Sequence, residues 1–469
     1  MRFLIDLISI IIITYFVLIN SSYIILFIIS YFGIKKYREK LKLNNYLMLF
    51  QSKLTPPISL IVPAYNESDT IIKNIYSFLS DFNYPNYEII VVNDGSKDNT
   101  LIKVLEEFDC AIDDFPYKKL IKTKKIKEVY KSPKYSKLIV IDKENSGKAD
   151  ALNAGINISK YPYFGSIDAD TILEPDSYLK VTIPILNEPT KIIASGGIVG
   201  VINGCETTGN KIKKIGYPKN ILAKFQVVEY LRAFLFGRYA WTLINALPII
   251  SGAFGLFQKE AVNKVGGYSS DSTKVSTVGE DMDLVIRLHR YYRKNKLDYK
   301  IVFVPDPLSW TQVPEDLKSL KNQRERWHRG LIETLFQSRD MLFNKNYGTI
   351  GLIGLPYYLI FEMLSPLVEL LGYILLPYFY FNNLIEFTVF LLFFVVSVLL
   401  GVIISSLAVF LEVMTFRRYK KLSNIYQMIL IAFLENFGYR QMMLVFRLQG
   451  FFKFYKKEKS WGEMKRKKL

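Results

Sequence analysis

The sequence predicts an α/β domain with a parallel β-sheet, flanked by apolar helices that associate with a membrane. Two apolar runs, at residues 58–67 and 87–96, are separated by a helical stretch at 68–81. Strand, helix and strand in this spacing are typical of a βαβ unit. Long apolar segments concentrate toward the two ends of the chain, and a membrane-spanning helix needs about 20 such residues.

The first apolar segment covers residues 3–33. It is too short for two full spans and a turn, so we expect one long or tilted helix. A tight hairpin of shortened helices and a cleaved signal peptide are the alternatives. Five basic residues follow the segment: Lys35, Lys36, Arg38, Lys40 and Lys42. The positive-inside rule therefore predicts a membrane segment at 1–34, a basic cytoplasmic linker at 35–54 and a cytoplasmic domain after it.

The central domain is expected to cover residues 55–345. Apolar runs at 137–145 and 163–170 predict further strands of its sheet. A lysine-rich segment at 117–137 interrupts the pattern. This segment is interpreted either as a loop or hairpin that lies against the membrane surface, or as a solvated run of charge.

Three apolar segments follow the domain, at 349–380, 386–414 and 422–445. The basic loop 417–421 is expected to be cytoplasmic, so the first two segments form a membrane hairpin. The third carries Glu435, Arg440 and Arg447. It either lies in the membrane interface or crosses it. Residues 346–448 are thus predicted to hold membrane or interfacial helices, and 449–469 a basic cytoplasmic tail.

The overall composition narrows the class of partner. The formal net charge is +18, and half of the residues are hydrophobic. Such a charge suggests an anionic partner, and the long apolar segments favour membrane lipids over nucleic acid, for which we find no binding motif. Cys110 and Cys205 are far apart and lack metal spacing, so no disulfide framework is expected. His289 and His328 are too few for a histidine-rich metal site.

Acidic residues follow several of the predicted strands. Asp94 follows the second strand, and Asp168 and Asp170 follow a later one. Ligands of parallel sheets bind at the carboxyl ends of the strands. Two carboxylates there can hold Mg²⁺ or Mn²⁺ together with the diphosphate of a nucleotide. An Asp-X-Asp pair alone is a weak signal, because most such pairs lie in surface loops.

Two further clusters come later in the domain. Glu280 and Asp281 precede a helical pattern at 282–292, where aspartate acts either as a helix cap or as a general base. The segment QRERW places Gln323, Arg326 and Trp327 on roughly one helical face. Arginine pairs with diphosphate oxygens, and tryptophan stacks on sugars. The alternative is an interfacial helix that anchors itself in lipid headgroups through these side chains.

The ordered set of these segments resembles the processive family 2 glycosyltransferases, which include cellulose, hyaluronan and poly-N-acetylglucosamine synthases. The resemblance runs through VPAYNE, VVNDGSKDNT, NSGKADALNAG, IDAD, ISGAFGLF, GEDMDL and QRERW, over about residues 55–335. The stretch KADALN is similar to the bacterial poly-N-acetylglucosamine synthases in particular. The resemblance implies a GT-A, Rossmann-like catalytic domain and an inverting transfer from a UDP-sugar, with N-acetylglucosamine as the expected sugar.

The resemblance also implies roles for single residues. Nucleotide and donor binding falls to Pro63, Tyr65, Glu67, Asp94, Lys148 and Asp168. Asp168 and Asp170 would hold Mg²⁺ or Mn²⁺, and Asp281 would be the catalytic base. The diphosphate and acceptor would be bound by Glu280, Gln323, Arg326 and Trp327.

Two small departures from the family pattern occur. Gly279 stands where many synthases have Thr, and Glu325 lies inside the Gln-X-X-Arg-Trp motif. Neither removes a group that the mechanism needs. Two rival hypotheses are an enzyme that adds one UDP-derived sugar to a membrane lipid and a catalytically silent membrane scaffold. UDP-glucose is the alternative donor. The acceptor, a growing glycan or a lipid, and an accessory membrane subunit stay open.

Overall fold

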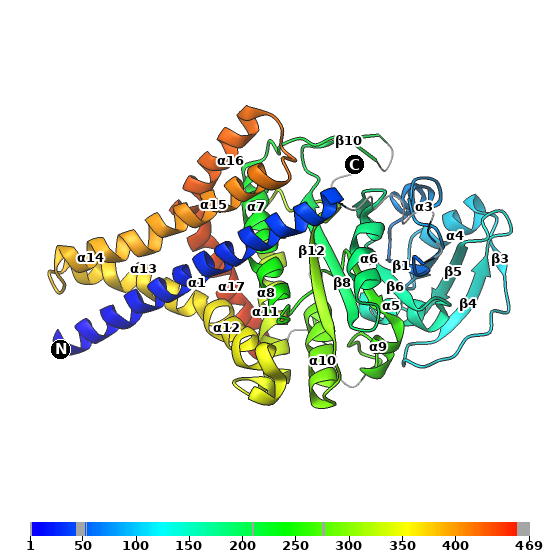
Figure 1. The fold of residues 1–469 in the computed structure, drawn as a ribbon, viewed down its shortest axis with the longest axis horizontal. Coiled ribbons are helices and arrows are strands. Elements are labelled where there is room, and N and C mark those ends of the chain that lie inside the picture. The colour runs from blue at the N-terminus through cyan, green and yellow to red at the C-terminus, as the bar shows by residue number, and fades with distance from the viewer. Residues whose placement is uncertain (1, 44–51, 53, 209–210, 274–276, 457–469) are drawn as a thin grey trace.

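The structure is a computed structural model that describes residues 2–43, 52, 54–208, 211–273 and 277–456. A mixed ten-stranded sheet forms one end of the molecule, and long apolar helices form the other (Figure 1). The strand order is β3-β4-β5-β2-β1-β6-β11-β8-β12-β7. A two-stranded sheet of β9 (Glu206–Thr208) and β10 (Lys211–Lys214) is separate.

The centre of the sheet is the predicted βαβ unit. Strands β1 (Ile58–Ala64) and β2 (Tyr87–Asn93) are parallel and joined through α3 (Ile71–Ser80). Strands β5 (Leu138–Lys143) and β6 (Tyr163–Ser166) continue the sheet in the same direction. The near-continuous burial of β1 and β2 explains why their sequences are apolar runs rather than alternating patterns. The carboxyl ends of these four strands therefore meet at one edge.

The second half of the sheet has no clear signal in the sequence. It consists of β7 (Ile172–Leu173), β8 (Ile192–Val201), β11 (Gly255–Gln258) and β12 (Lys300–Thr311). Strand β11 is antiparallel to both β6 and β8, and β12 is parallel to β8. The remaining helices of this domain are α4 (Thr100–Glu107), α5 (Lys148–Ile158), α6 (Ser177–Asn187), α9 (Lys259–Lys264) and α10 (Glu280–Lys294).

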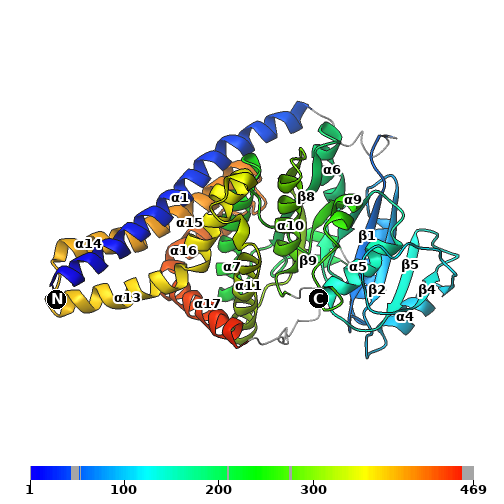
Figure 2. The same ribbon diagram turned by 90° about the horizontal axis from the view of Figure 1, so that it is seen from below.

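The lysine-rich segment 117–137 contributes a strand at one lateral end of the ten-stranded sheet. Its strand β4 (Ile126–Lys131) is antiparallel to β5 and to the short β3 (Ala111–Ile112). Figures 1 and 2 place these strands at the end of the molecule opposite the apolar helices. This position favours the interpretation of the segment as a solvated run of charge over one that lies against the membrane surface.

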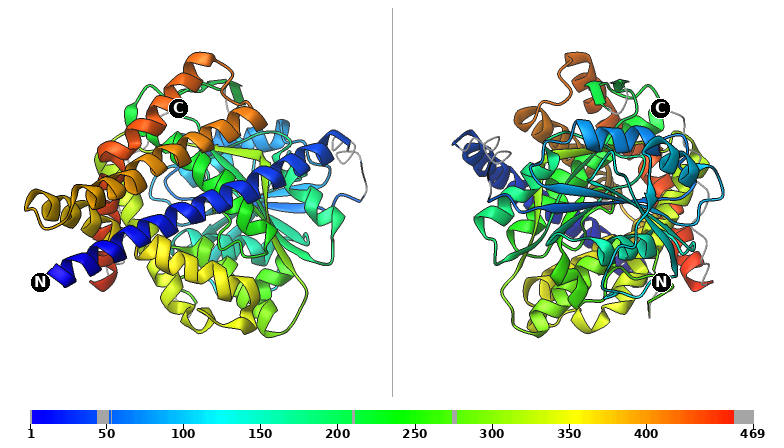
Figure 3. Two further views of the ribbon diagram at one scale, coloured as in Figure 1. Left: turned by 60° about the vertical axis from the view of Figure 1, so that its left-hand side comes forward. Right: turned by 90° about the vertical axis from the view of Figure 1, so that its right-hand side faces the viewer.

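The first apolar segment forms a single helix, α1 (Arg2–Leu43), as expected. The hairpin alternative is excluded, and the helix continues through the basic residues at 35–42. By length and composition, four described helical stretches are able to cross a membrane: Arg2–Leu41, Ile350–Phe381, Phe387–Thr415 and Leu422–Tyr455. In the right-hand view of Figure 3 the sheet faces the viewer and these helices lie behind it.

The C-terminal helices contain several short π-helical turns. The second stretch comprises η4 (Ile350–Gly354), α12 (Leu355–Tyr357), η5 (Tyr358–Met363) and α13 (Ser365–Phe381). The third comprises α14 (Phe387–Phe394), η6 (Val395–Leu399) and α15 (Leu400–Thr415). The fourth comprises α16 (Leu422–Leu434), η7 (Glu435–Tyr439) and α17 (Arg440–Tyr455). The fourth is broken at Phe437 and Gly438, whose backbone angles are not helical. Since α16 and α17 are each shorter than about 20 residues, this break favours an interfacial position.

Two helical segments connect the sheet to the apolar helices. The first is α7 (Ile221–Leu231), η1 (Arg232–Arg238) and α8 (Tyr239–Leu243), and the second is α11 (Leu317–Gln337). Helix α11 packs along α17, where the buried Glu325 forms an ion pair of 2.5 Å with Lys453. The unexpected glutamate of the QRERW segment thus attaches α11 to the last helix. Single 3-10 turns occur at Arg339–Met341 and Lys345–Tyr347.

Candidate functional site

One cavity of about 1840 Å³ lies between the sheet edge, α10, α11, η1 and η5. Pockets for a single small molecule usually measure about 300–1,000 Å³, so this cavity has room for two substrates. Every candidate residue from the sequence lies on its wall: Pro63, Tyr65, Glu67, Asp94, Lys148, Asp168, Asp170, Glu280, Asp281, Gln323, Arg326 and Trp327. The structure therefore brings together residues that are more than 250 positions apart in the sequence.

The sheet end of the cavity is charged. Lys148, the first residue of α5, forms an ion pair with Asp168 and donates a hydrogen bond of 3.3 Å to the carbonyl oxygen of Gly252. Burial alone would lower the pKa of Lys148, but the carboxylates of Asp168, Glu280 and Asp281 outweigh burial and raise that pKa. Lys148 is therefore a fixed cation that links the Asp168 region to the start of α10.

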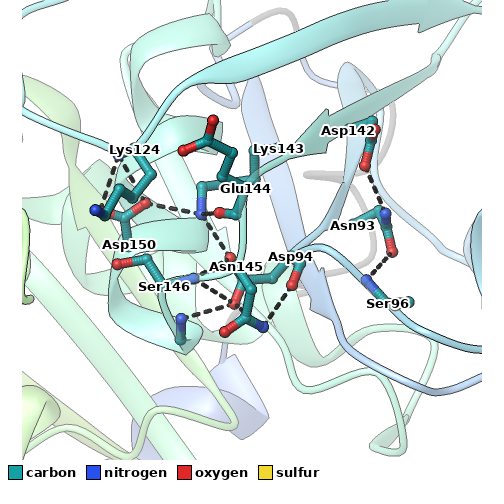
Figure 4. A network of polar contacts seen from close by, with 11 residues as sticks. Asn93, Asp94, Ser96, Lys124, Asp142, Lys143, Glu144, Asn145, Ser146 and Asp150 are labelled. Carbon is teal, nitrogen blue, oxygen red and sulfur yellow. Dashed lines mark hydrogen bonds and ion pairs between the residues drawn. The ribbon is translucent and has the colours of Figure 1, made fainter.

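Asp94 is the centre of a buried polar network (Figure 4). Its carboxylate lies 2.5 Å from the ammonium of Lys143, which also contacts Asp150 at 2.8 Å. The same carboxylate accepts a hydrogen bond of 2.7 Å from the backbone N–H of Gly147, whose φ of +86° suits glycine. Burial raises the pKa of Asp94, and Lys143 opposes that rise. Asp94 thus lies on the cavity wall as expected, while its carboxylate shapes the loop before α5.

The carboxylate of Asp281 is oriented by two backbone groups. Oδ1 accepts a hydrogen bond of 2.9 Å from Met282 N–H, and Oδ2 accepts one of 3.3 Å from Gly252 N–H. Gly279, not Asp281, occupies the N-cap position of α10, so helix capping does not account for this carboxylate. Burial and the neighbouring Asp281 raise the pKa of Glu280 to about 7. The Glu280 carboxyl group therefore titrates near neutral pH.

Helix α11 supplies the opposite wall. The Oε1 atom of Gln323 is buried and has no hydrogen-bond partner among the described residues, so it can accept one from a ligand. Trp327 is 43% exposed, and the Arg324 guanidinium stacks over its ring at 4.5 Å. Arg324 is held in turn by Glu229 at 2.8 Å. A tryptophan that is fixed on one side and open on the other suits stacking on a sugar ring.

The carboxylates at the sheet end match what a nucleotide-bound cation needs. Asp168 and Asp170 both face the cavity, and Asp168 already pairs with a cation, Lys148. Among the described residues, no group of three or more His, Cys, Asp or Glu side chains is arranged to hold a metal. Mg²⁺ in nucleotide sites is typically bound by one or two carboxylates, phosphates and water. The donor set therefore fits a divalent cation that arrives with a diphosphate.

Several cavity residues carry no sequence signal. Arg238, Tyr230 and Tyr358 line the cavity from η1, α7 and η5, and Lys143 pairs with Asp94 behind the cavity wall. Lys143 is the last residue of an apolar strand, and Arg238 lies inside an apolar stretch. Neither lies in a motif, and only three-dimensional packing places them at the site.

Comparisons with known proteins agree with this geometry. Residues 59–266 match the model of "Glycosyl transferase family 2", and residues 164–411 match "Glycosyl transferase family group 2". The chain is 32% identical over 320 residues to the poly-beta-1,6-N-acetyl-D-glucosamine synthase of Staphylococcus epidermidis. It is 31% identical over 323 residues to the protein of that name from Staphylococcus aureus strain MSSA476. Both matches cover 68% of this chain but only 64% of the relative.

A solved structure shares the fold. A mannosyltransferase from Pyrobaculum calidifontis, determined in complex with GDP-Man and Mn²⁺, superimposes with a TM-score of 0.53 at 16% identity. The superposition covers 96% of this chain and 100% of that chain. This likeness confirms the GT-A fold that the sequence predicts.

Proposed function

The chain belongs to glycosyltransferase family 2, and we propose that it is an inverting membrane enzyme that adds sugar to a growing β-linked polysaccharide. The proposed donor is UDP-N-acetylglucosamine, in keeping with the names of the synthases to which the chain is similar. The observation that carries the proposal is the shared cavity. Its sheet side carries Lys148, Asp168 and Asp170, and its α11 side carries Gln323, Arg326 and Trp327. Asp281, at the start of α10, lines the same cavity.

The proposed reaction is a single displacement. Asp281 removes the proton from the acceptor hydroxyl as its oxygen attacks the anomeric carbon of the donor. Arg326 and Lys148 stabilise the negative charge that develops on the leaving diphosphate. A bound Mg²⁺ or Mn²⁺, held by Asp168 and Asp170, would add to that stabilisation. Because the mechanism uses no carboxylate nucleophile, an α-linked donor gives a β-linked product.

The remaining nucleotide contacts are proposed as the sequence predicts them. Pro63, Tyr65 and Glu67 follow or end β1 beside Asp94 and would surround the nucleoside. Glu280, with its raised pKa, lies next to the base and would contact the acceptor or diphosphate. Trp327 would stack on the acceptor's terminal sugar.

A second candidate function is the addition of one sugar to a membrane lipid, and UDP-glucose is a second candidate donor. One observation favours a lipid acceptor. The cavity extends to Tyr358 and Glu362 of η5, which belong to an apolar stretch long enough to span a membrane. The proposed location is the cell membrane with several spans and a cytoplasmic catalytic domain, because the basic residues at 35–42 follow the first apolar stretch. Membrane lipids and an accessory membrane subunit are further proposed partners.

The proposed function is tested by product analysis. Membranes that contain the protein are incubated with radiolabelled UDP-N-acetylglucosamine, UDP-glucose and other nucleotide sugars in parallel. We expect label from UDP-N-acetylglucosamine to enter material of high molecular weight. Label confined to an organic-soluble product of one sugar would favour the glycolipid function, and no transfer from any donor would contradict both.

Removal of divalent cations should abolish transfer. No group of three or more His, Cys, Asp or Glu side chains among the described residues is arranged to hold a metal, so a cation should bind together with the donor's diphosphate and be extracted by EDTA. The measurement is sugar transfer after chelation and after addition of excess Mg²⁺ or Mn²⁺, which should restore it. Full activity after rigorous chelation would remove the metal from the mechanism.

A further inference from the structure

The cavity has a second end, formed by η1 and η5. Arg238, the last residue of η1, lines this end together with Tyr230, Phe234, Tyr358 and Glu362. Aromatic rings dominate it, in contrast to the carboxylates of the sheet end. Tyr358 and Glu362 come from the apolar stretch Ile350–Phe381, so this end adjoins the helices that would lie in lipid.

The other charged side chains at this end have partners. Glu362 pairs with Arg447 at 3.3 Å and accepts a hydrogen bond of 3.3 Å from the Tyr23 hydroxyl. Arg232, at the start of the same π-helix as Arg238, pairs with the buried Glu435. Charge is thus compensated across the surrounding helices, as expected where the surroundings are apolar.

Arg238 is different. Within the described part of the chain it has no ion-pair partner, and its Nη1 atom is buried without a hydrogen-bond partner. Its guanidinium stacks over the ring of Phe234 at 4.2 Å, which fixes its orientation but leaves the Nη1 donor unused. A buried donor without a hydrogen-bond partner lowers the stability of the folded protein. Burial also lowers the pKa of Arg238. Such a guanidinium suits a ligand that accepts hydrogen bonds and carries negative charge.

Arg238 and the proposed donor residue Lys148 come from different elements, η1 and α5. Asp281 acts electrostatically on two of the cations that line the cavity, Lys148 and Arg238. The other partners of Lys148 are Asp168 and Glu280, whereas those of Arg238 are Tyr358 and Tyr230. The Asp281 carboxylate is thus within electrostatic reach of Lys148 on α5 and of Arg238 on η1.

We propose that Arg238 binds the phosphate of a membrane lipid, and that this phosphate-bearing lipid is the acceptor whose hydroxyl reaches Asp281. The guanidinium presents a planar set of donors that matches two phosphate oxygens. The lipid's chains would lie along η5 and the apolar helices. The identification of this lipid as the acceptor rests on the second candidate function, the addition of one sugar to a membrane lipid, while the phosphate site itself does not.

Lipid binding to the purified full-length protein tests the site. Delipidated protein is titrated with dioleoyl phosphatidic acid, and bound lipid is counted by native mass spectrometry. Dioleoylglycerol, which has the same chains without phosphate, serves as the comparison. We expect Arg238→Gln to weaken phosphatidic acid binding on the order of tenfold or more, the effect of losing a hydrogen bond to a charged group. Binding of dioleoylglycerol and of UDP should not change.

Two further variants complete the test. Arg238→Lys keeps the charge and should retain more phosphatidic acid binding than Arg238→Gln. Arg290→Gln removes an arginine that is paired with Asp340 at 2.7 Å outside the cavity, and it should bind as the wild type does. Equal phosphatidic acid binding by wild type and Arg238→Gln would overturn the proposal.

The remaining outcomes identify the source of the phosphate. Weakened UDP binding in Arg238→Gln would assign the residue to the donor diphosphate and overturn the proposal. Glycerol phosphate in solution that binds as tightly as phosphatidic acid would overturn the lipid part. If the wild type transfers no sugar from any donor, the proposed function fails, and the lipid titration still decides whether Arg238 is a phosphate site.

Discussion

Replacement of Asp281 by asparagine should lower the turnover number on the order of 100-fold or more and leave donor affinity nearly unchanged. Asparagine cannot take up the acceptor's proton, and general-base catalysis typically contributes about that factor. Its side-chain oxygen can still accept a hydrogen bond of the kind that Met282 N–H or Gly252 N–H now donates. The measurement is the transfer rate and the UDP-sugar affinity of the purified variant.

A neighbouring carboxylate provides the control for this experiment. Asp283 lies on the same helix, outside the cavity, and pairs with Arg287 at 2.8 Å. Asp283→Asn should lower thermal stability but reduce turnover much less than Asp281→Asn does. Near wild-type turnover in Asp281→Asn would exclude it as the base, and loss of donor affinity would place it in the donor site instead.

Disruption of the close contact between Gly279 and Gly330 should cause the second large loss of turnover. A Cβ atom on Gly330 would lie 2.8 Å from Gly279 Cα and 2.9 Å from Gly279 N. Both are backbone atoms that cannot rotate away, so α10 and α11 would have to separate. Asp281 lies just after Gly279, and Trp327 lies one turn before Gly330. Separation would move the base away from the proposed acceptor site.

Gly330→Ala should therefore reduce turnover on the order of 100-fold, the effect of displacing a catalytic group by about 1 Å. Its melting temperature should also fall. The matched control is Gly237→Ala on η1, because a Cβ atom there meets no heavy atom within 4 Å. The measurement is turnover and melting temperature of both variants. A Gly330→Ala protein that is as active as Gly237→Ala would show that this contact does not position Asp281.

The sequence predicts the parts of the molecule that depend on local patterns. Strands β1, β2, β5 and β6 are buried apolar runs, and a polar residue follows most of them, so both the sheet centre and the donor side of the cavity were predictable. The long helix α1 followed from length and hydropathy alone. These features need no knowledge of how distant segments meet.

The features that the sequence did not predict depend on contacts between distant segments. A Cβ atom on Gly279 would lie 2.9 Å from the Cα atom of Gly330, about 50 residues later, so this departure from the family pattern lies at a close contact between two helices. Glu325 appeared neutral in its motif but pairs with Lys453 of the last helix. The lysine-rich segment was ambiguous because charge alone does not distinguish a sheet edge from a membrane surface. Its pairing with β5 places it in the sheet, at the end of the molecule opposite the apolar helices.

The central claim, that this cavity performs an inverting transfer with Asp281 as the base, is tested most directly by the stereochemistry of the product. Purified wild-type protein is supplied with UDP-N-acetylglucosamine, whose sugar is α-linked, and the new glycosidic bond is examined by nuclear magnetic resonance at an early time point. We predict a β-linked product from the wild type and almost none from Asp281→Asn. An α-linked product would require a different mechanism and would contradict the role assigned to Asp281.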